Sequence, residues 1–90
     1  MVAICLHCFV SGRVQGVFYR REACEQAKKR GLTGYAKNCL DGRVEVMLCG
    51  EKEAVKKMSE WLWEGSPSSK VTKVEIKEAP LQIFSGFEVK

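Results

Sequence analysis

The chain has 90 residues, 46% of them hydrophobic and 29% charged. This length allows one domain, over residues 1–90, with one modest core, and the composition excludes a disordered chain. The net charge of +4 favours anionic partners, but basic and acidic residues are interleaved along the chain, so a nucleic-acid partner is not expected.

The sequence shows no sign of a membrane segment or an export signal. It lacks an apolar run of the roughly 18 residues that a membrane span needs, and its N-terminus does not follow the pattern of a signal peptide. We therefore expect a cytoplasmic protein with no membrane partner. The five cysteines form an odd set in such a chain and are expected to be reduced thiols.

The first half of the chain begins with a strand and a helix. Residues 2–10 are apolar and β-rich, which predicts a central strand with alternate residues on one face. Residues 18–30 carry small and apolar side chains at helical spacing, and Gly31 is typical of a helix end.

Asp41-Gly42 separates two extended segments and predicts a hairpin. Further on, Trp61 falls on the apolar side of a second helix, and Trp63 does not. The remaining expected elements are strands at residues 33–40 and 43–49, a helix at 51–63, a strand at 70–78 and a short strand at 84–89.

This order, β-α-β-β-α-β plus a short C-terminal strand, is that of an α+β protein of the ferredoxin-like, split βαβ type. We expect two helices packed on one face of a mainly antiparallel sheet.

The string GRVQGVFYRR, residues 12–21, joins the first strand to the first helix. Gly12 and Gly16 can take positive φ, so the loop between them can turn successive N–H groups inward, where the helix N-terminus reinforces their attraction for an anion. Arg20 stands where the helix dipole disfavours a cation, which suggests an anionic guest such as phosphate. Alternatively, the glycines only permit a tight turn, and Arg20 and Arg21 are solvated surface residues.

Two stretches resemble the signatures of one family. GRVQGVFYR, residues 12–20, resembles the first signature of the acylphosphatase family, and GYAKNCLDGRVEVMLCG, residues 34–50, is similar to the second. The resemblance covers essentially the whole chain.

The resemblance implies hydrolysis of an acyl phosphate to a carboxylate and inorganic phosphate, without a metal or another cofactor. It implies that Arg20 binds the phosphate and that Asn38 positions the attacking water. It further implies that main-chain N–H groups surround the phosphate oxygens, at Gln15, Gly16, Val17, Phe18 and Tyr19. The hairpin register stays open, and a slip of one residue would move Asn38 to the other face of the sheet.

The resemblance leads us to expect a monomer that takes a small acyl phosphate as substrate and inorganic phosphate as product and inhibitor. One alternative is a non-catalytic module of this fold that binds an anion or RNA, although the segment RVEVML offers no aromatic side chain for base stacking. Another is a regulatory domain of a larger chain, which the start at Met1 and the compact ends disfavour.

The remaining candidate side chains favour no other chemistry. Cys5 and Cys8 are three apart in a strand, so they face opposite ways and cannot share a metal ion. His7 shares a face with Cys5, but the pattern shows no third group for a Cys-His nucleophile. Asp41 and Glu45 are interpreted as a turn former and a sheet-surface charge.

Overall fold

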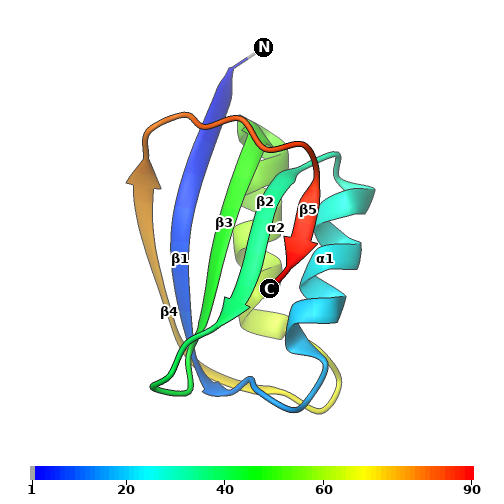
Figure 1. Ribbon diagram of the computed structural model, residues 1–90, viewed down its shortest axis with the longest axis vertical. Coiled ribbons are helices and arrows are strands. Elements are labelled where there is room, and N and C mark those ends of the chain that lie inside the picture. The colour runs from blue at the N-terminus through cyan, green and yellow to red at the C-terminus, as the bar shows by residue number, and fades with distance from the viewer. Residues whose placement is uncertain (1) are drawn as a thin grey trace.

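The computed structural model describes residues 2–90 and confirms the ferredoxin-like α+β arrangement (Figure 1). Each expected element is present, with ends shifted by a few residues. The elements are β1 (Ala3–Arg13), α1 (Tyr19–Lys29), β2 (Thr33–Asn38), β3 (Val44–Glu51), α2 (Lys52–Glu64), β4 (Lys70–Ala79) and β5 (Phe87–Val89).

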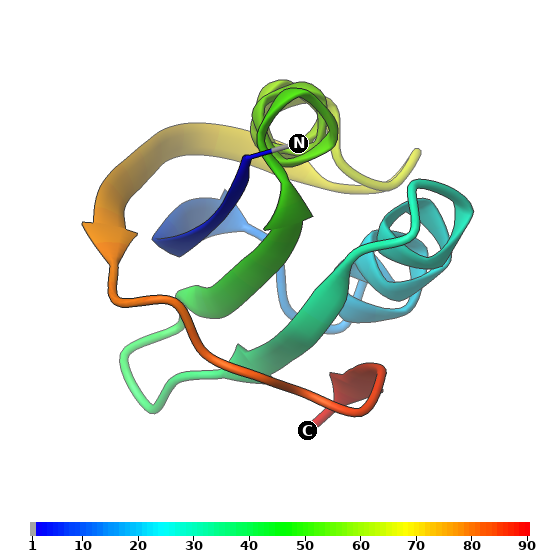
Figure 2. The same cartoon turned by 90° about the horizontal axis from the view of Figure 1, so that it is seen from above.

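The strands form one twisted sheet in the order β4-β1-β3-β2-β5. All neighbouring pairs are antiparallel except β2 and β5, which run parallel. Strand β1 has a neighbour on each side, as its continuous apolar run predicts. Seen from above, both helices lie on the same side of the sheet (Figure 2).

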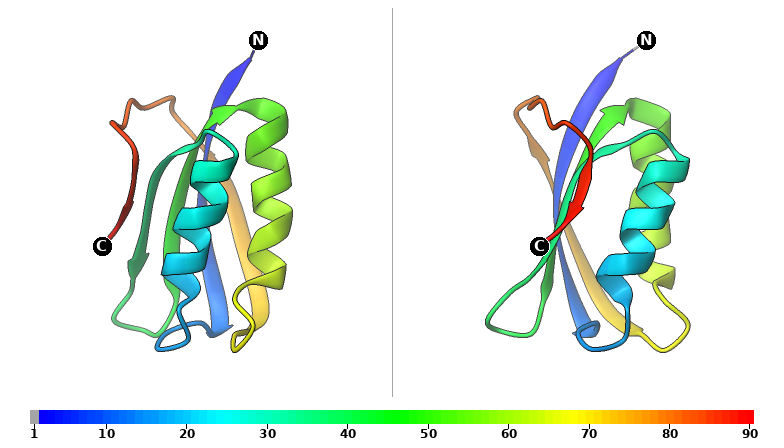
Figure 3. Two further views of the ribbon diagram at one scale, coloured as in Figure 1. Left: turned by 90° about the vertical axis from the view of Figure 1, so that its right-hand side faces the viewer. Right: turned by 45° about the vertical axis from the view of Figure 1, so that its right-hand side comes forward.

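The core lies between the sheet and the two helices (Figure 3). Helix α2 buries Val55, Met58 and Leu62, which the three-to-four-residue spacing places on one side. Trp61 joins them, whereas Trp63 is 53% exposed, and both placements were expected. Among residues 2–90, no helix is long and apolar enough to cross a membrane.

The opposite face of the sheet carries a smaller apolar cluster. Cys5, Met47 and Cys49 are buried there, and Phe84 packs against them. Phe84 belongs to the segment of residues 80–86, which crosses this face on its way from β4 to β5 (Figure 2). The crossing segment covers one end of the face that lacks helices.

Cys5 and Cys49 form a disulfide, so the expectation of five reduced thiols is wrong for this pair. The two residues are directly opposite each other in the antiparallel pairing of β1 with β3, with their Cα atoms 4.1 Å apart. Only the register brings them together, because they are 44 residues apart in sequence. Cys8, Cys24 and Cys39 are free.

The hairpin between β2 and β3 is longer than the expected two-residue turn. Strand β2 ends at Asn38, and a five-residue connection, residues 39–43, follows. The N–H of Cys39 donates to the carbonyl of Arg43 at 2.8 Å, and the carboxylate of Asp41 accepts from the N–H and the Nε of Arg43. Asp41 therefore forms the turn, as expected, but the loop is wider than two residues. In it, the N–H of Arg43 donates to the Asp41 side chain instead of to a main-chain carbonyl.

Reducing the Cys5–Cys49 bond is expected to lower the free energy of unfolding by about 2–4 kcal/mol, because the bond closes a long loop in the unfolded chain. Urea denaturation with and without dithiothreitol measures this loss. A Cys39→Ser variant, which keeps the bond, should remain as sensitive to the reductant as the parent. Equal midpoints in both conditions would contradict the expectation.

Candidate active site

Three connections meet at one end of the sheet (Figures 1 and 3). They are the glycine loop (residues 14–18), the hairpin connection (residues 39–43) and the loop after α2 (residues 65–69). Gln15 Nε2 donates to the carbonyls of Cys39 and Arg43 at 2.8 and 2.9 Å. On the other side, Ser66 Oγ donates to the carbonyl of Val17 at 2.7 Å. The glycine loop is thus held from both sides.

The two glycines of the motif lie in different elements and have different structural roles. Gly16 has φ 74° and lies in the loop, as expected. Gly12 lies inside β1, at a break in the register with β4, and its φ is 120°. A Cβ there would lie 2.2 Å from the carbonyl oxygen of Lys70. Gly12 therefore permits close approach of two strands, and the expectation that it shapes the loop is wrong.

Helix α1 begins at an N-cap residue, Phe18, that has a left-handed backbone with φ 63° and ψ 21°. Within residues 2–90, the helix start has no side-chain cap hydrogen bond. In contrast, the carboxylate of Glu51 accepts from two N–H groups at the start of α2. The first N–H groups of α1 have no partner within the helix, so they are available to an anion.

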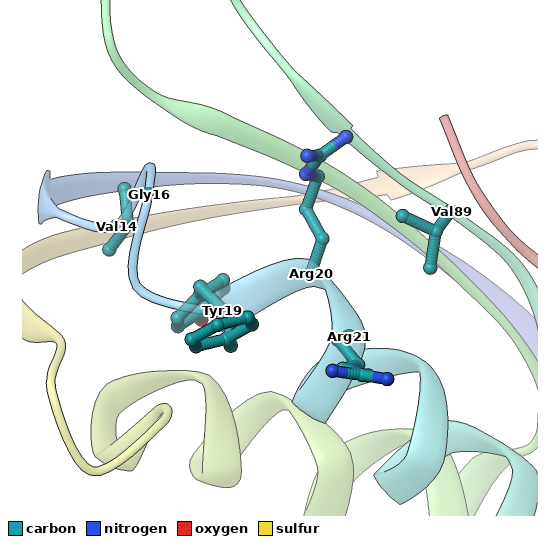
Figure 4. Close-up of a pocket in the computed structure, with 7 residues that line it drawn as sticks. Val14, Gly16, Tyr19, Arg20, Arg21 and Val89 are labelled. Carbon is teal, nitrogen blue, oxygen red and sulfur yellow. The ribbon is translucent and has the colours of Figure 1, made fainter.

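Arg20 extends from this helix start into a cavity of about 250 Å³. In Figure 4 its side chain points toward the sheet, whereas Arg21 leaves the helix in another direction. Arg20 Nη1 donates to the main-chain oxygen of Lys90, whose N–H donates to Ala36 in β2. The other residues that line the cavity are Val14, Gly16, Phe18, Tyr19, Arg21 and Val89.

The side chains of Val17 and Tyr19 belong to the core. Both are buried, and Tyr19 donates from its hydroxyl to the carbonyl of Leu62 at 2.7 Å. Burial raises the pKa of the Tyr19 phenol far above its ordinary value, so the phenol stays protonated. Any contact of Val17 or Tyr19 with a ligand in the loop must therefore come from the main chain.

Asn38 lies at the end of β2 and faces the helices. The register pairs it with the buried Val44, so it did not slip to the other face. Its Oδ1 is buried and accepts no hydrogen bond from residues 2–90. Asn38 does not line the cavity of Arg20. It lines another cavity, together with Asp41 and Glu45, and the two cavities share no lining residue.

The two carboxylates near Asn38 are already engaged. Glu45 accepts hydrogen bonds from His7 at 2.7 Å and Tyr35 at 2.6 Å. Burial alone would raise the Glu45 pKa, but the hydrogen bonds from Tyr35 and His7 outweigh it and leave the pKa below its ordinary value. The Asp41 pKa is also lowered, first by the main-chain N–H of Arg43. Both groups are therefore weak bases.

Glu45 lies on the surface of the sheet, as expected. Aromatic rings from other strands, which are not part of the segment RVEVML, lie on the same face. Phe9 on β1 lies under the guanidinium of Arg43, 4.5 Å from the ring centroid. The ammonium of Lys90 lies 4.4 Å from the ring centroid of Tyr35 on β2. Both rings are therefore already paired with cations of the protein.

Cys5 and Cys8 lie on opposite faces of β1. Cys8 belongs to the core, and burial raises its pKa to about 12, which keeps the thiol protonated. Cys5 lies on the opposite face, as expected, and is in the disulfide. Within residues 2–90, no three His, Cys, Asp or Glu side chains are grouped closely enough to hold a metal ion.

Two side chains that hold the loop were not predicted from the sequence. Gln15 was expected to offer only its main-chain N–H, whereas its side chain binds the hairpin connection. Ser66 was not among the expected site residues, although it is buried and bonded to Val17. Neither contact has a local signal, because the partners lie far apart along the chain.

Comparison with known proteins identifies the family of the chain. The family model Acylphosphatase matches residues 6–89. A protein named Acylphosphatase from Chromohalobacter salexigens is 55% identical over 75 residues, which is 83% of each chain. One from Pseudomonas paraeruginosa is 46% identical over 100% of this chain and 99% of its own. The solved structure of an acylphosphatase from Coxiella burnetii is 41% identical with a TM-score of 0.94, covering 98% of this chain and 93% of its own.

The chain therefore belongs to the acylphosphatase family, and it is an enzyme.

Replacing Gln15 with alanine is expected to lower the free energy of unfolding by about 1–3 kcal/mol, because two carbonyls of the hairpin connection lose their donor. Gln15→Glu should cost at least as much at neutral pH, since a carboxylate cannot donate to a carbonyl. Urea denaturation measures both changes.

Gln82→Ala is the matched control, because the Gln82 side chain is exposed and forms no hydrogen bond within residues 2–90. If the two Gln15 variants unfold at the same urea concentration as Gln82→Ala, the side chain does not hold the loop.

Proposed function

We propose that the enzyme hydrolyses the carboxyl-phosphate bond of acyl phosphates without a metal ion. In this proposal, Arg20 and the main-chain N–H groups from Gln15 to Tyr19 hold the phosphoryl group, and Asn38 orients the attacking water. The observation that supports it best is the uncapped start of α1, which opens beside the Arg20 guanidinium.

The site combines two kinds of donor for phosphoryl oxygens. The free N–H groups of the helix start are fixed by the fold and carry the positive end of the helix dipole. Arg20 gives one hydrogen bond to Lys90, and a guanidinium has five N–H donors, so four remain for oxygens of the substrate. Donors held in advance where charge develops are an effective means of lowering a barrier.

Asn38 is suited to orient a water molecule. Its buried Oδ1 lacks a donor among residues 2–90, and a buried acceptor without a partner is costly unless a water or ligand satisfies it. A water that donates one proton to Oδ1 directs a lone pair toward phosphorus. The water oxygen then bonds to phosphorus, while the bond from phosphorus to the acyl oxygen breaks and its electron pair leaves with the carboxylate.

The water must also lose a proton. Asp41 and Glu45, the carboxylates that line the same cavity as Asn38, have lowered pKa values and existing hydrogen-bond partners, so they are poor acceptors. We therefore assign the proton to a phosphoryl oxygen of the substrate. The acyl phosphate is a reactive mixed anhydride with a good leaving group, so orientation and charge stabilisation supply most of the rate.

Inorganic phosphate, the product, is expected to bind the same donors and to inhibit. We further propose that one chain is the active unit, because every group named here comes from one chain.

The cytoplasmic location stays a prediction. To test it, the free thiols are alkylated at the moment of cell lysis, and the measurement is whether Cys5 and Cys49 were reduced or joined in the cell.

Arg20→Gln is expected to lower kcat/KM for benzoyl phosphate by about a hundredfold or more, since it removes a charged donor from the phosphoryl group. Inhibition by phosphate should disappear as well. Hydrolysis is followed by the loss of acyl phosphate absorbance, and circular dichroism checks folding. Arg30→Gln is the matched control, because it removes the same charge at the other end of α1. An active Arg20→Gln enzyme would refute the proposal.

Asn38→Ala is expected to lower kcat by about a hundredfold while phosphate still inhibits, because only the water loses its acceptor. The free energy of unfolding should not fall, since the substitution removes a buried oxygen without a partner. Steady-state kinetics and urea denaturation measure the two effects. If stability falls along with activity, Asn38 supports the fold rather than the water.

A further inference from the structure

A second cavity lies next to the one that holds Arg20. Its volume is about 300 Å³, and it lies between the start of α1 and the loop after α2. Phe18 and Arg21 line both cavities, so the two spaces meet at these side chains. The remaining lining residues are Val17, Glu22, Ser66, Pro67 and Ser68.

Phe18 stands at the junction in an unusual conformation. It is the only residue other than glycine with positive φ in residues 2–90, and its side chain is 66% exposed. A bulky side chain in this backbone region costs about 1–3 kcal/mol. The exposed ring does not repay this cost by burial in the core. The exposed surface of the ring is open to a ligand.

The ring stands on a fixed main chain. The carbonyl of Val17, just before it, accepts from the buried Ser66, and the carbonyl of Phe18 accepts from the N–H of Glu22 at 3.0 Å. The Arg21 guanidinium lies 5.9 Å from the ring centroid. The ring is therefore a flat apolar surface with the Arg21 cation over one of its faces, at a greater distance than the cations over Phe9 and Tyr35.

The second cavity also lies on the side where a leaving group belongs. In phosphoryl transfer, the attacking and leaving oxygens are roughly in line through phosphorus. Figure 3 shows the hairpin connection on one side of the glycine loop and the loop after α2 on the other. Asn38 shares a cavity with residues of the hairpin connection, whereas residues 66–68 line the second cavity. In the proposed reaction, water from the hairpin side would therefore displace a group that points toward the second cavity.

We propose that the second cavity is the acyl subsite, and that Phe18 selects substrates with a flat, aromatic acyl group. This inference rests on the proposed function. The acyl ring lies against the phenyl ring of Phe18, and the departing carboxylate forms near Arg21. Among residues 2–90, no carboxylate lies within ion-pair distance of Arg21, so its charge is free for that carboxylate.

The test compares kcat/KM for benzoyl phosphate with kcat/KM for acetyl phosphate, which lacks the ring. Phe18→Leu should lower the ratio of the two about fivefold, the equivalent of about 1 kcal/mol for an aromatic pair. Ser68→Trp should lower the same ratio, because an indole then fills the cavity. Lys56→Trp, on the exposed side of α2, is the control and should keep the parent ratio.

Binding of the non-hydrolysable analogues benzoylphosphonate and acetylphosphonate, measured by calorimetry, separates the subsite from the activity. The parent protein should bind the benzoyl analogue more tightly, and both variants should lose this preference. If both acyl phosphates are hydrolysed and neither variant changes the ratio or the preference, the acyl subsite is wrong and the activity stands. If neither acyl phosphate is hydrolysed but the analogues show the preference, the subsite stands and the proposed function fails.

Discussion

The start of helix α1 has no side-chain cap among residues 2–90. At α2, Glu51 satisfies the first N–H groups, whereas at α1 the N-cap position is taken by Phe18 in a left-handed conformation. Unpartnered N–H groups are costly when they are shielded from water, and in the proposed function an anionic phosphoryl group accepts their hydrogen bonds. The glycine loop, Arg20 and the adjoining cavities are all arranged around these N–H groups.

The rest of the fold keeps this helix start in place. Gln15 connects the loop to the hairpin connection, and Ser66 connects it to the loop after α2. Tyr19 anchors the first turn of α1 to the end of α2 through its hydroxyl. These contacts tie the loop to three elements of the sandwich, so the donors hold their positions before a ligand arrives. Such preorganisation is what catalysis by charge stabilisation requires.

The carboxylates that share a cavity with Asn38 are not suited to accept a proton. Glu45 and Asp41 line its cavity, yet their hydrogen bonds hold both as weak bases. The chemistry proposed for the site therefore depends on main-chain donors, one guanidinium and one amide rather than on a titrating side chain. An acyl phosphate, with its good leaving group, is a substrate for which such a site is sufficient.

Periodicity along the chain determined the elements and their buried faces, because alternation and helical spacing are local properties. The two signature strings supplied the resemblance that pointed to Arg20 and Asn38. Neither pattern supplied the width of the hairpin, in which the Asp41 carboxylate accepts from the N–H of Arg43. The disulfide between Cys5 and Cys49, the place of Gly12 inside β1 and the hydrogen bonds of Gln15 were decided only by the tertiary structure. Each depends on strand register or on partners distant in sequence, and no local pattern encodes the relative position of two such segments.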